Sequence, residues 1–192
     1  MDDFHTQLIP SHYCSNCNVH KGFFDAEQSI ISQTIYGVRQ LIKDFPGYSI
    51  IVTGHSLGAA LATLTTLDLM RNFTDSSPPT ILMINFGSPS VGDDGFASYA
   101  SEQLIPFHYR VTHYRDIVPH LPWSRRYTHI NGEWYEDEDH LLHECQGYED
   151  SNCADQWYIL SIEDHMSCAA VSSPSSHLSI PPFSYPFPFQ DF

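Results

Sequence analysis

Basic residues are scarce in this sequence. Lys and Arg number 8 among 192 residues, against 23 Asp and Glu, which gives a formal net charge of −15 at pH 7. This excess of negative charge repels phosphate backbones and anionic bilayers, so nucleic acid is a poor partner. No run reaches about 18 consecutive apolar residues, so no membrane-spanning helix is expected. Residues 1–10 have neither a basic segment nor an apolar run, and no signal peptide is visible.

The residues that are present are sufficient for a folded core. The sequence is 42% hydrophobic and 14% aromatic, and its length suits one α/β domain. Five cysteines form two closely spaced pairs with one left over, a pattern that favours a disulfide framework and therefore a secreted protein. They are Cys14, Cys17, Cys145, Cys153 and Cys168. Since no signal peptide is visible, we expect that the true amino terminus of such a secreted protein lies outside this sequence.

Predicted strands and helices alternate along the first part of the chain. Apolar residues at helical spacing define the helices, and short β-branched runs define the strands. This alternation predicts an α/β fold with a mostly parallel sheet covered by helices on both faces. Strands are expected at Ser49–Thr53, Thr80–Phe86 and Phe107–His113, and helices at about Asp25–Phe45, Leu57–Arg71 and Phe96–Gln103.

The remaining segments have weaker patterns. Asn131-Gly132 is a preferred two-residue turn, so Arg126–Glu136 is expected to form a hairpin at one sheet edge. Glu136–Asp155 is acidic and rich in His, and we interpret it as a surface loop tied by cysteines. Residues 169–192 contain five Pro, six Ser and four Phe, which predicts a disordered tail. The folded domain is therefore expected to span residues 1–168.

The segment Gly54-His55-Ser56-Leu57-Gly58 lies between a predicted strand and a predicted helix. In this context G-x-S-x-G is a nucleophile elbow, a sharp turn that exposes the Ser hydroxyl at the carboxyl end of a strand. We expect Gly54 and Gly58 to give clearance where a Cβ would collide. The Leu57 N–H, at the helix amino terminus, can donate to a developing oxyanion. The alternative is a Gly-rich turn with a solvated Ser.

A hydroxyl nucleophile needs a base, and the base needs an acid that orients it. In folds with a nucleophile elbow, the acid lies between the nucleophile and the base along the chain. Asp116 follows the third predicted strand and would emerge at the same sheet end as Ser56; the alternative is an ordinary loop Asp. Position alone does not select the base. His165 is best placed, because the apolar run Trp157–Ile162 can form a buried segment that brings it to the site. The candidates are His120, His129, His140, His143, His165 and His177.

Four segments in a fixed order carry a resemblance to a known family. They are Val19–Phe23 (VHKGF), Val52–Ala60 (VTGHSLGAA), Asn85–Gly92 (NFGSPSVG) and Asp116–Pro122 (DIVPHLP). Together they resemble the fungal-type, class 3 triacylglycerol lipases and the related feruloyl esterases. The resemblance extends over about residues 19–165.

The resemblance implies an α/β-hydrolase fold and a serine carboxylic ester hydrolase similar to a triacylglycerol lipase. The implied residues are Ser56 as nucleophile, Asp116 as acid, His165 as base, Leu57 as oxyanion donor, and Val118 and Leu121 in the acyl cleft. The implied substrate is a neutral lipid or another carboxylic ester, met at a lipid–water interface, and the full-length protein would be extracellular. No cofactor and no metal are implied.

Similarity to the feruloyl esterase branch also implies the disulfides Cys14–Cys17 and Cys145–Cys153. The rival for the first pair is a metal site, since four residues there have the chemistry of a tetrahedral zinc site. These are His12, Cys14, Cys17 and His20.

Three departures from the family pattern stand out. Ser90 occupies a position where many members carry Arg, and Cys168 follows His165 where the family continues with an aromatic helix. Only 22 residues precede Phe23, whereas the family has an upstream strand, a second oxyanion donor and a helical lid. The sequence is therefore expected to begin just beyond the lid, and these 192 residues alone to show little or no esterase activity. The alternative function is a catalytically impaired fragment or a non-enzymatic remnant of such a lipase.

Overall fold

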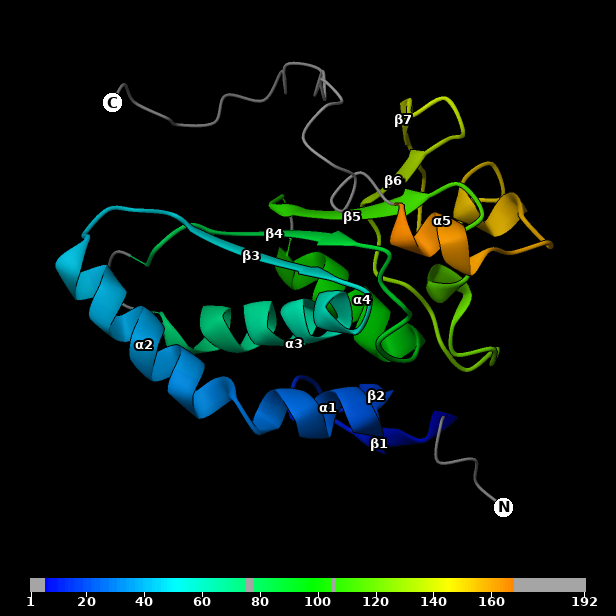
Figure 1. The fold of residues 1–192 in the computed structure, drawn as a ribbon. Helices are drawn as coiled ribbons and strands as arrows, with labels where there is room; N and C mark the ends of the chain where they lie inside the picture. Colours follow the sequence, from blue (N-terminus) through cyan, green and yellow to red (C-terminus); the bar gives the residue numbers. More distant parts are fainter. Residues whose placement is uncertain (1–5, 75–77, 105, 168–192) are drawn as a thin grey trace.

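A five-stranded sheet forms the centre of the computed structural model, which describes residues 6–74, 78–104 and 106–167 (Figure 1). Its strand order is β3-β4-β5-β6-β7; β3 to β6 run parallel, and β7 pairs antiparallel with β6. A separate antiparallel ribbon consists of β1 and β2. The strands are β1 (Leu8–Pro10), β2 (Asn18–His20), β3 (Ile50–His55), β4 (Ile81–Phe86), β5 (His108–His113), β6 (Glu133–Glu136) and β7 (Leu142–Glu144).

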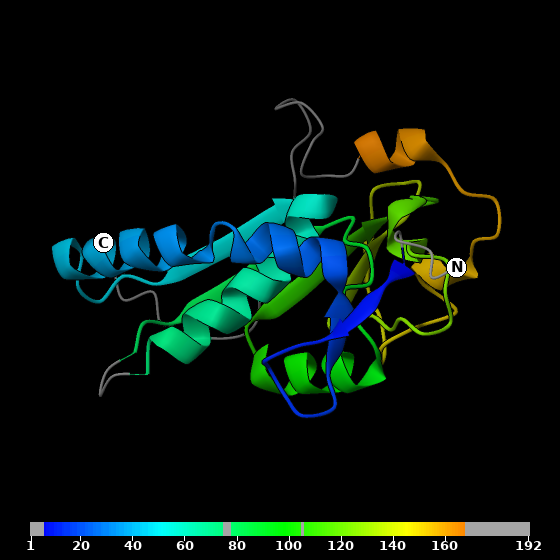
Figure 2. The same cartoon turned by 90° about the horizontal axis from the view of Figure 1, so that it is seen from below.

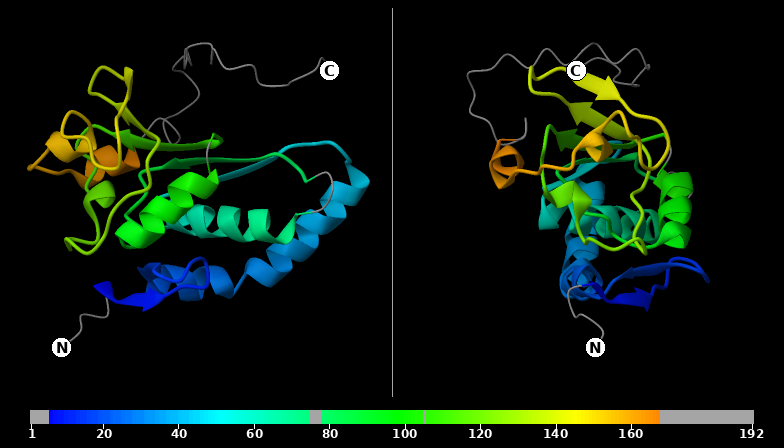
Figure 3. Two further views of the ribbon diagram at one scale, coloured as in Figure 1. Left: turned by 180° about the vertical axis from the view of Figure 1, so that it is seen from behind. Right: turned by 90° about the vertical axis from the view of Figure 1, so that its right-hand side faces the viewer.

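The helices α1 to α4 lie on one side of the sheet (Figures 1 and 3). Seen from below, α1 and α2 follow one another in nearly one line, and α3 lies between them and α4 (Figure 2). The remaining helix, α5, lies beyond the carboxyl ends of the strands, and no helix among the described residues covers the opposite face (Figures 1 and 3). The two faces are therefore covered unequally. The helices are α1 (Lys21–Gln28), α2 (Ile31–Asp44), α3 (Leu57–Asn72), α4 (Asp94–Leu104) and α5 (Ile162–Met166), with short 3-10 turns η2 (Val118–His120) and η3 (Ala154–Gln156).

The main core lies between the sheet and α3. Alternate residues of β4 point toward the helices and are buried, while their neighbours on the other face are only half-buried. Buried alanines on α3 allow its backbone to approach the sheet closely. This packing holds β3 and α3 rigidly on either side of residue 56. The largest fully buried apolar side chains in this core are Val19, Leu64, Leu67, Met83 and Phe96.

The predicted strands and helices lie close to their expected positions, except that one predicted helix is divided into two. The single helix expected at about Asp25–Phe45 is two helices, α1 and α2, separated at Ser29 and Ile30. The Ser29 backbone N–H and hydroxyl bond to the carbonyls of Asp25 and Ala26, which ends α1. Hydrophobic spacing is insensitive to such a local cap, so the prediction of one helix was wrong.

The predicted hairpin at Asn131-Gly132 is also wrong. Gly132 has φ +79°, but the strand that follows it, β6, pairs in parallel with β5. The hairpin is instead formed by β6 and β7, with residues 137–141 as its connection. A Cβ on Gly132 would lie 3.0 Å from the His108 ring, so glycine here permits close packing against β5.

The apolar run Trp157–Ile162 is not the buried segment that we expected. Tyr158 is 94% exposed and Ile159 is 77% exposed. Backbone hydrogen bonds hold this segment instead: the Ser161 N–H donates to the Arg115 carbonyl, and the Ile117 N–H donates to the Ser161 carbonyl. The segment therefore reaches the site through an edge pairing beside Asp116.

The chain ends raise two further points. No helix within the described ranges combines the length and apolar character needed to cross a membrane. The predicted tail at residues 169–192 lies outside the described residues, as does Cys168, so the boundary expected at residue 168 stays a prediction.

Candidate active site

Ser56 stands at the junction of β3 and α3 in a strained conformation. Its φ is +58° and its ψ is −129°, a region that non-glycine residues rarely adopt. Gly54 makes this turn possible, because a Cβ there would lie 2.2 Å from the Gly58 carbonyl oxygen. Gly58 itself needs no clearance: a Cβ at that position would meet nothing within 4 Å among the described residues, which corrects our expectation for it.

The amino terminus of α3 faces the same turn. Leu57 is the first residue of this 16-residue helix, and the first N–H groups of a helix have no acceptor within it. The helix dipole adds positive potential at this point. The Leu57 N–H is thus a suitable donor for an anionic oxygen formed at Ser56.

Asp116 and His165 form a buried pair. The His165 Nδ1 lies 2.9 Å from the Asp116 Oδ2, and the two residues are 4% and 1% exposed. The other carboxylate oxygen, Oδ1, accepts a 2.8 Å hydrogen bond from the Val118 N–H. A carboxylate at Nδ1 places the ring proton there and leaves the Nε2 lone pair available as a base.

His55 connects this pair to the nucleophile turn. Its Nε2 donates a 3.0 Å hydrogen bond to the His165 carbonyl, and the two rings stack with centroids 4.4 Å apart. His55 directly precedes Ser56, so α5 is fixed against the end of β3. No hydrogen bond joins the Ser56 hydroxyl to His165 among the described residues, and in free enzymes such bonds often tighten only when substrate binds.

Gly87 completes the arrangement and was not singled out by the sequence reasoning. It has φ +53°, and a Cβ on it would lie 2.7 Å from the Asp116 Oδ2 and 3.1 Å from the His165 Nδ1. Only glycine leaves room for the pair. In the sequence, Gly87 stands directly after the predicted strand Thr80–Phe86, and this position is the signal that could have identified it. His55 and Ser161 were also missed, because their roles depend on contacts with residues far away along the chain.

Comparison with known proteins gives a consistent result. The family model described as Lipase (class 3) matches residues 1–125. The chain belongs to the class 3 lipase family. A lipase of Rhizomucor miehei is 33% identical over 173 residues, covering 86% of this chain and 47% of that protein. A secreted mono- and diacylglycerol lipase 2 of Gibberella zeae is 32% identical over 161 residues, covering 75% and 38%.

Solved structures of such lipases superpose on this chain. Rhizomucor miehei triacylglyceride lipase matches with a TM-score of 0.78 and 32% identity, covering 85% of this chain and 63% of that one. A second match, with a TM-score of 0.77 and 32% identity, is a triacylglycerol lipase whose catalytic centre is described as a serine protease triad. The fold is therefore the α/β-hydrolase fold. This class 3 lipase chain spans about half or less of the length of its curated relatives.

Val118 and Leu121, the residues implied for the acyl cleft, lie at the two ends of η2, just after Asp116. Both are half-buried. The Leu121 N–H donates to the Val118 carbonyl, which closes the turn. The Val118 N–H also donates to Asp116, so the turn begins directly at the acid of the pair.

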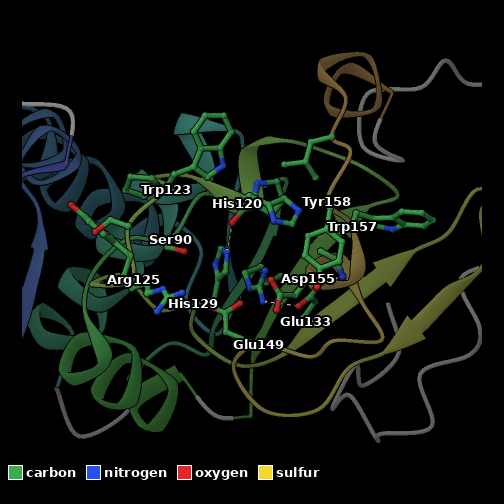
Figure 4. A pocket seen from close by; sticks show the side chains of 17 residues that line it. Ser90, His120, Trp123, Arg125, His129, Glu133, Glu149, Asp155, Trp157 and Tyr158 are labelled. Atoms are coloured by element: carbon green, nitrogen blue, oxygen red, sulfur yellow. Dashed lines mark hydrogen bonds and ion pairs between the residues drawn. The ribbon is translucent and has the colours of Figure 1, made fainter. Parts of the chain in front are cut away.

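A cavity beside η2 has none of Ser56, Asp116 or His165 in its wall (Figure 4). Its volume is about 580 Å³, and Pro119 and His120 of η2 form part of its wall. The wall includes Ser90, the departure from the family pattern noted above.

Polar groups in this wall lie deep in the protein. Arg110 Nη2 bonds to Glu133 at 2.9 Å, and both residues are buried. Burial lowers the pKa of His129 well below its usual value. Glu149 is an exposed residue, and partial desolvation of its carboxyl raises its pKa. The His129 Nε2 donates a 2.6 Å hydrogen bond to the Pro119 carbonyl and so supports η2.

Both expected disulfides are present, Cys14–Cys17 and Cys145–Cys153. The rival zinc interpretation of the first pair is wrong in this structure, because its two sulfurs bond to each other. The two histidines also have other partners: the His12 Nε2 lies 3.0 Å from Asp68, and His20 caps α1.

Proposed function

We propose that this chain carries the catalytic site of a serine carboxylic ester hydrolase similar to a triacylglycerol lipase. Ser56 is the nucleophile, His165 the general base and Asp116 the orienting acid. The observation that carries the proposal is the buried 2.9 Å bond between His165 and Asp116, fixed through His55 to a strained serine turn. A matched lipase structure also supports the proposal, because its catalytic centre is described as a serine protease triad.

The reaction follows from these positions. As the Ser56 oxygen attacks the ester carbonyl, its proton passes to the His165 Nε2, and Asp116 stabilises the imidazolium that forms. The Leu57 N–H donates to the carbonyl oxygen as it becomes negative. His165 then protonates the departing alcohol, and a water activated by the same imidazole releases the acid from Ser56.

The substrate class follows from the surroundings of the pair. Val118 and Leu121 are half-buried apolar residues of the turn that follows Asp116, which suits an acyl chain. We propose a neutral lipid or another carboxylic ester as substrate, met at a lipid–water interface. The two disulfides suit an oxidising compartment, and one relative is named as secreted, so we propose that the whole protein is extracellular.

A fluorophosphonate probe tests the proposal directly, because it reacts once with an activated serine and requires no turnover. We expect the folded chain to be labelled and Ser56→Ala to lose the label. Ser151→Ala, which removes an exposed hydroxyl, serves as the control and should label as the wild type does. A folded chain that is not labelled, or a label that survives Ser56→Ala, would contradict the proposal.

A further inference from the structure

A cluster of imidazole and carboxylate groups lies at the end of β5 and β6, and the proposed hydrolysis does not use it. His113 and Glu136 are the last residues of these strands, and they are register partners in the parallel pair. His140 lies in the connection between β6 and β7. One ligand atom from each of the three residues lies within 4.8 Å of the ligand atoms of the other two. The sheet therefore fixes two of the three groups, and the hairpin brings the third to them.

His113 is prepared to bind through one particular nitrogen. Its Nδ1 lies 2.9 Å from the backbone carbonyl of Asp164, and a carbonyl can only accept a hydrogen bond. The ring proton is therefore on Nδ1, and the Nε2 keeps its lone pair. Metal-binding histidines are typically oriented in this way, by a hydrogen bond from the second ring nitrogen to a carbonyl or carboxylate.

His140 is held over the other two groups by an unusual backbone conformation. Its φ is +61°, which a non-glycine residue adopts at a cost. Its ring is parallel to that of His113, with centroids 5.8 Å apart, and its Nδ1 lies 2.9 Å from the Glu136 Oε1. A neutral imidazole can carry its proton on either nitrogen, so a change of tautomer presents the Nδ1 lone pair. His140 is also the exposed member of the cluster, which gives an ion access.

The charge around the cluster favours a cation. Four consecutive acidic residues, 136–139, precede His140. Asp137 pairs with His143, and Glu138 accepts a hydrogen bond from the Tyr114 hydroxyl. The carboxylate of Glu136 lies beside the two imidazoles, within a protein of net charge −15.

We propose that His113, Glu136 and His140 form a binding site for Zn²⁺. Two imidazoles and one carboxylate are an established zinc ligand set, with water in the fourth position. Tetrahedral ligands at about 2.0–2.2 Å from zinc lie roughly 3.3 Å apart, so the cluster must contract, and the exposed His140 can move to achieve this. Calcium and magnesium prefer all-oxygen sites and are not expected to bind here.

The position of the site gives it a structural consequence. His113 holds the carbonyl of Asp164, the residue directly before His165, and α5 lies at the same end of the molecule as β6 and β7 (Figures 1 and 3). A bound ion would therefore tie the β6–β7 hairpin to the base of α5. The binding itself does not rest on the proposed hydrolysis.

Titration of the 192-residue chain, with its disulfides intact, tests the proposal. Zn²⁺ is added in competition with a chromophoric chelator, and Co²⁺ is added while visible absorption is followed for tetrahedral bands. The variant is His140→Asn, because Asn tolerates positive φ and lacks an imidazole. The control is His143→Asn, which removes an exposed imidazole of the same hairpin that pairs with Asp137.

We expect the wild type and His143→Asn to bind one Zn²⁺ per chain and to melt at a higher temperature when it is present. His140→Asn should bind Zn²⁺ more than about 100-fold more weakly and show no such shift. Glu136→Gln, which keeps the shape of the side chain, should weaken binding as well. Absence of Zn²⁺ binding by the folded wild type overturns the proposal. So does equal affinity in the wild type and His140→Asn, the result expected if Cys168 or His177 held the ion.

Discussion

Replacing Gly87 by Ala should disable the candidate active site while leaving most of the fold intact. The added Cβ would lie 2.7 Å from the Asp116 Oδ2 and 3.1 Å from the His165 Nδ1, so the 2.9 Å bond between them cannot persist. The φ of +53° adds about 1–2 kcal/mol of backbone strain for Ala. Loss of the orienting acid in a serine triad costs about 10⁴-fold in turnover, so we expect labelling of Ser56 by a fluorophosphonate to slow by about 10²- to 10⁴-fold.

A second glycine separates the effect on the site from backbone strain. Gly47 has φ +88°, and a Cβ there would meet nothing within 4 Å among the described residues. Gly47→Ala therefore adds the strain without touching the pair, and it should label at the wild-type rate while its melting temperature falls. Labelling and thermal unfolding are measured on both variants. A Gly87→Ala chain that labels as fast as Gly47→Ala would refute the proposed role of the Asp116–His165 bond.

Two further predictions concern the turn and the core. Gly54→Ala should abolish Ser56 labelling, because its Cβ would lie 2.2 Å from the Gly58 carbonyl oxygen. Gly58→Ala should be tolerated. Equal losses of labelling in the two variants would contradict the geometry of the turn. Burial raises the pKa of Glu27 from 4.5 to about 7, so the native state holds a proton that the unfolded state releases, and stability falls as pH rises across that interval. Glu27→Gln should remove up to about 3 kcal/mol of the pH dependence of the free energy of unfolding, measured with urea at pH 5 and pH 8. An unchanged pH dependence would show that Glu27 is not its source.

The parts of the fold predicted from sequence are those set by local pattern. β3, Ser56 and α3 follow one another within a single continuous segment, and both hydrophobic spacing and the G-x-S-x-G motif report on it. β4 and β5 are short, largely buried segments of ordinary strand length. These elements form where expected because each is specified by its own residues.

The parts that were not predicted depend on contacts between distant segments. Gly132 is required for packing against His108, a contact that looks like a turn signal when only neighbours are considered. Ser161 reaches Asp116 by backbone pairing, which leaves no hydrophobic pattern. For the same reason the prediction of His165 as base came from chain order and family resemblance, while the buried segment expected to deliver it was wrong.

A double-mutant cycle on His165 and Asp116 tests the central claim most directly. The rate of fluorophosphonate labelling of Ser56 is measured in the wild type, His165→Ala, Asp116→Ala and the double variant, each checked for folding by circular dichroism. If Asp116 acts only through His165, the double variant should label no more slowly than His165→Ala alone. Losses that multiply would contradict the account, because they would show that the two side chains act independently of each other.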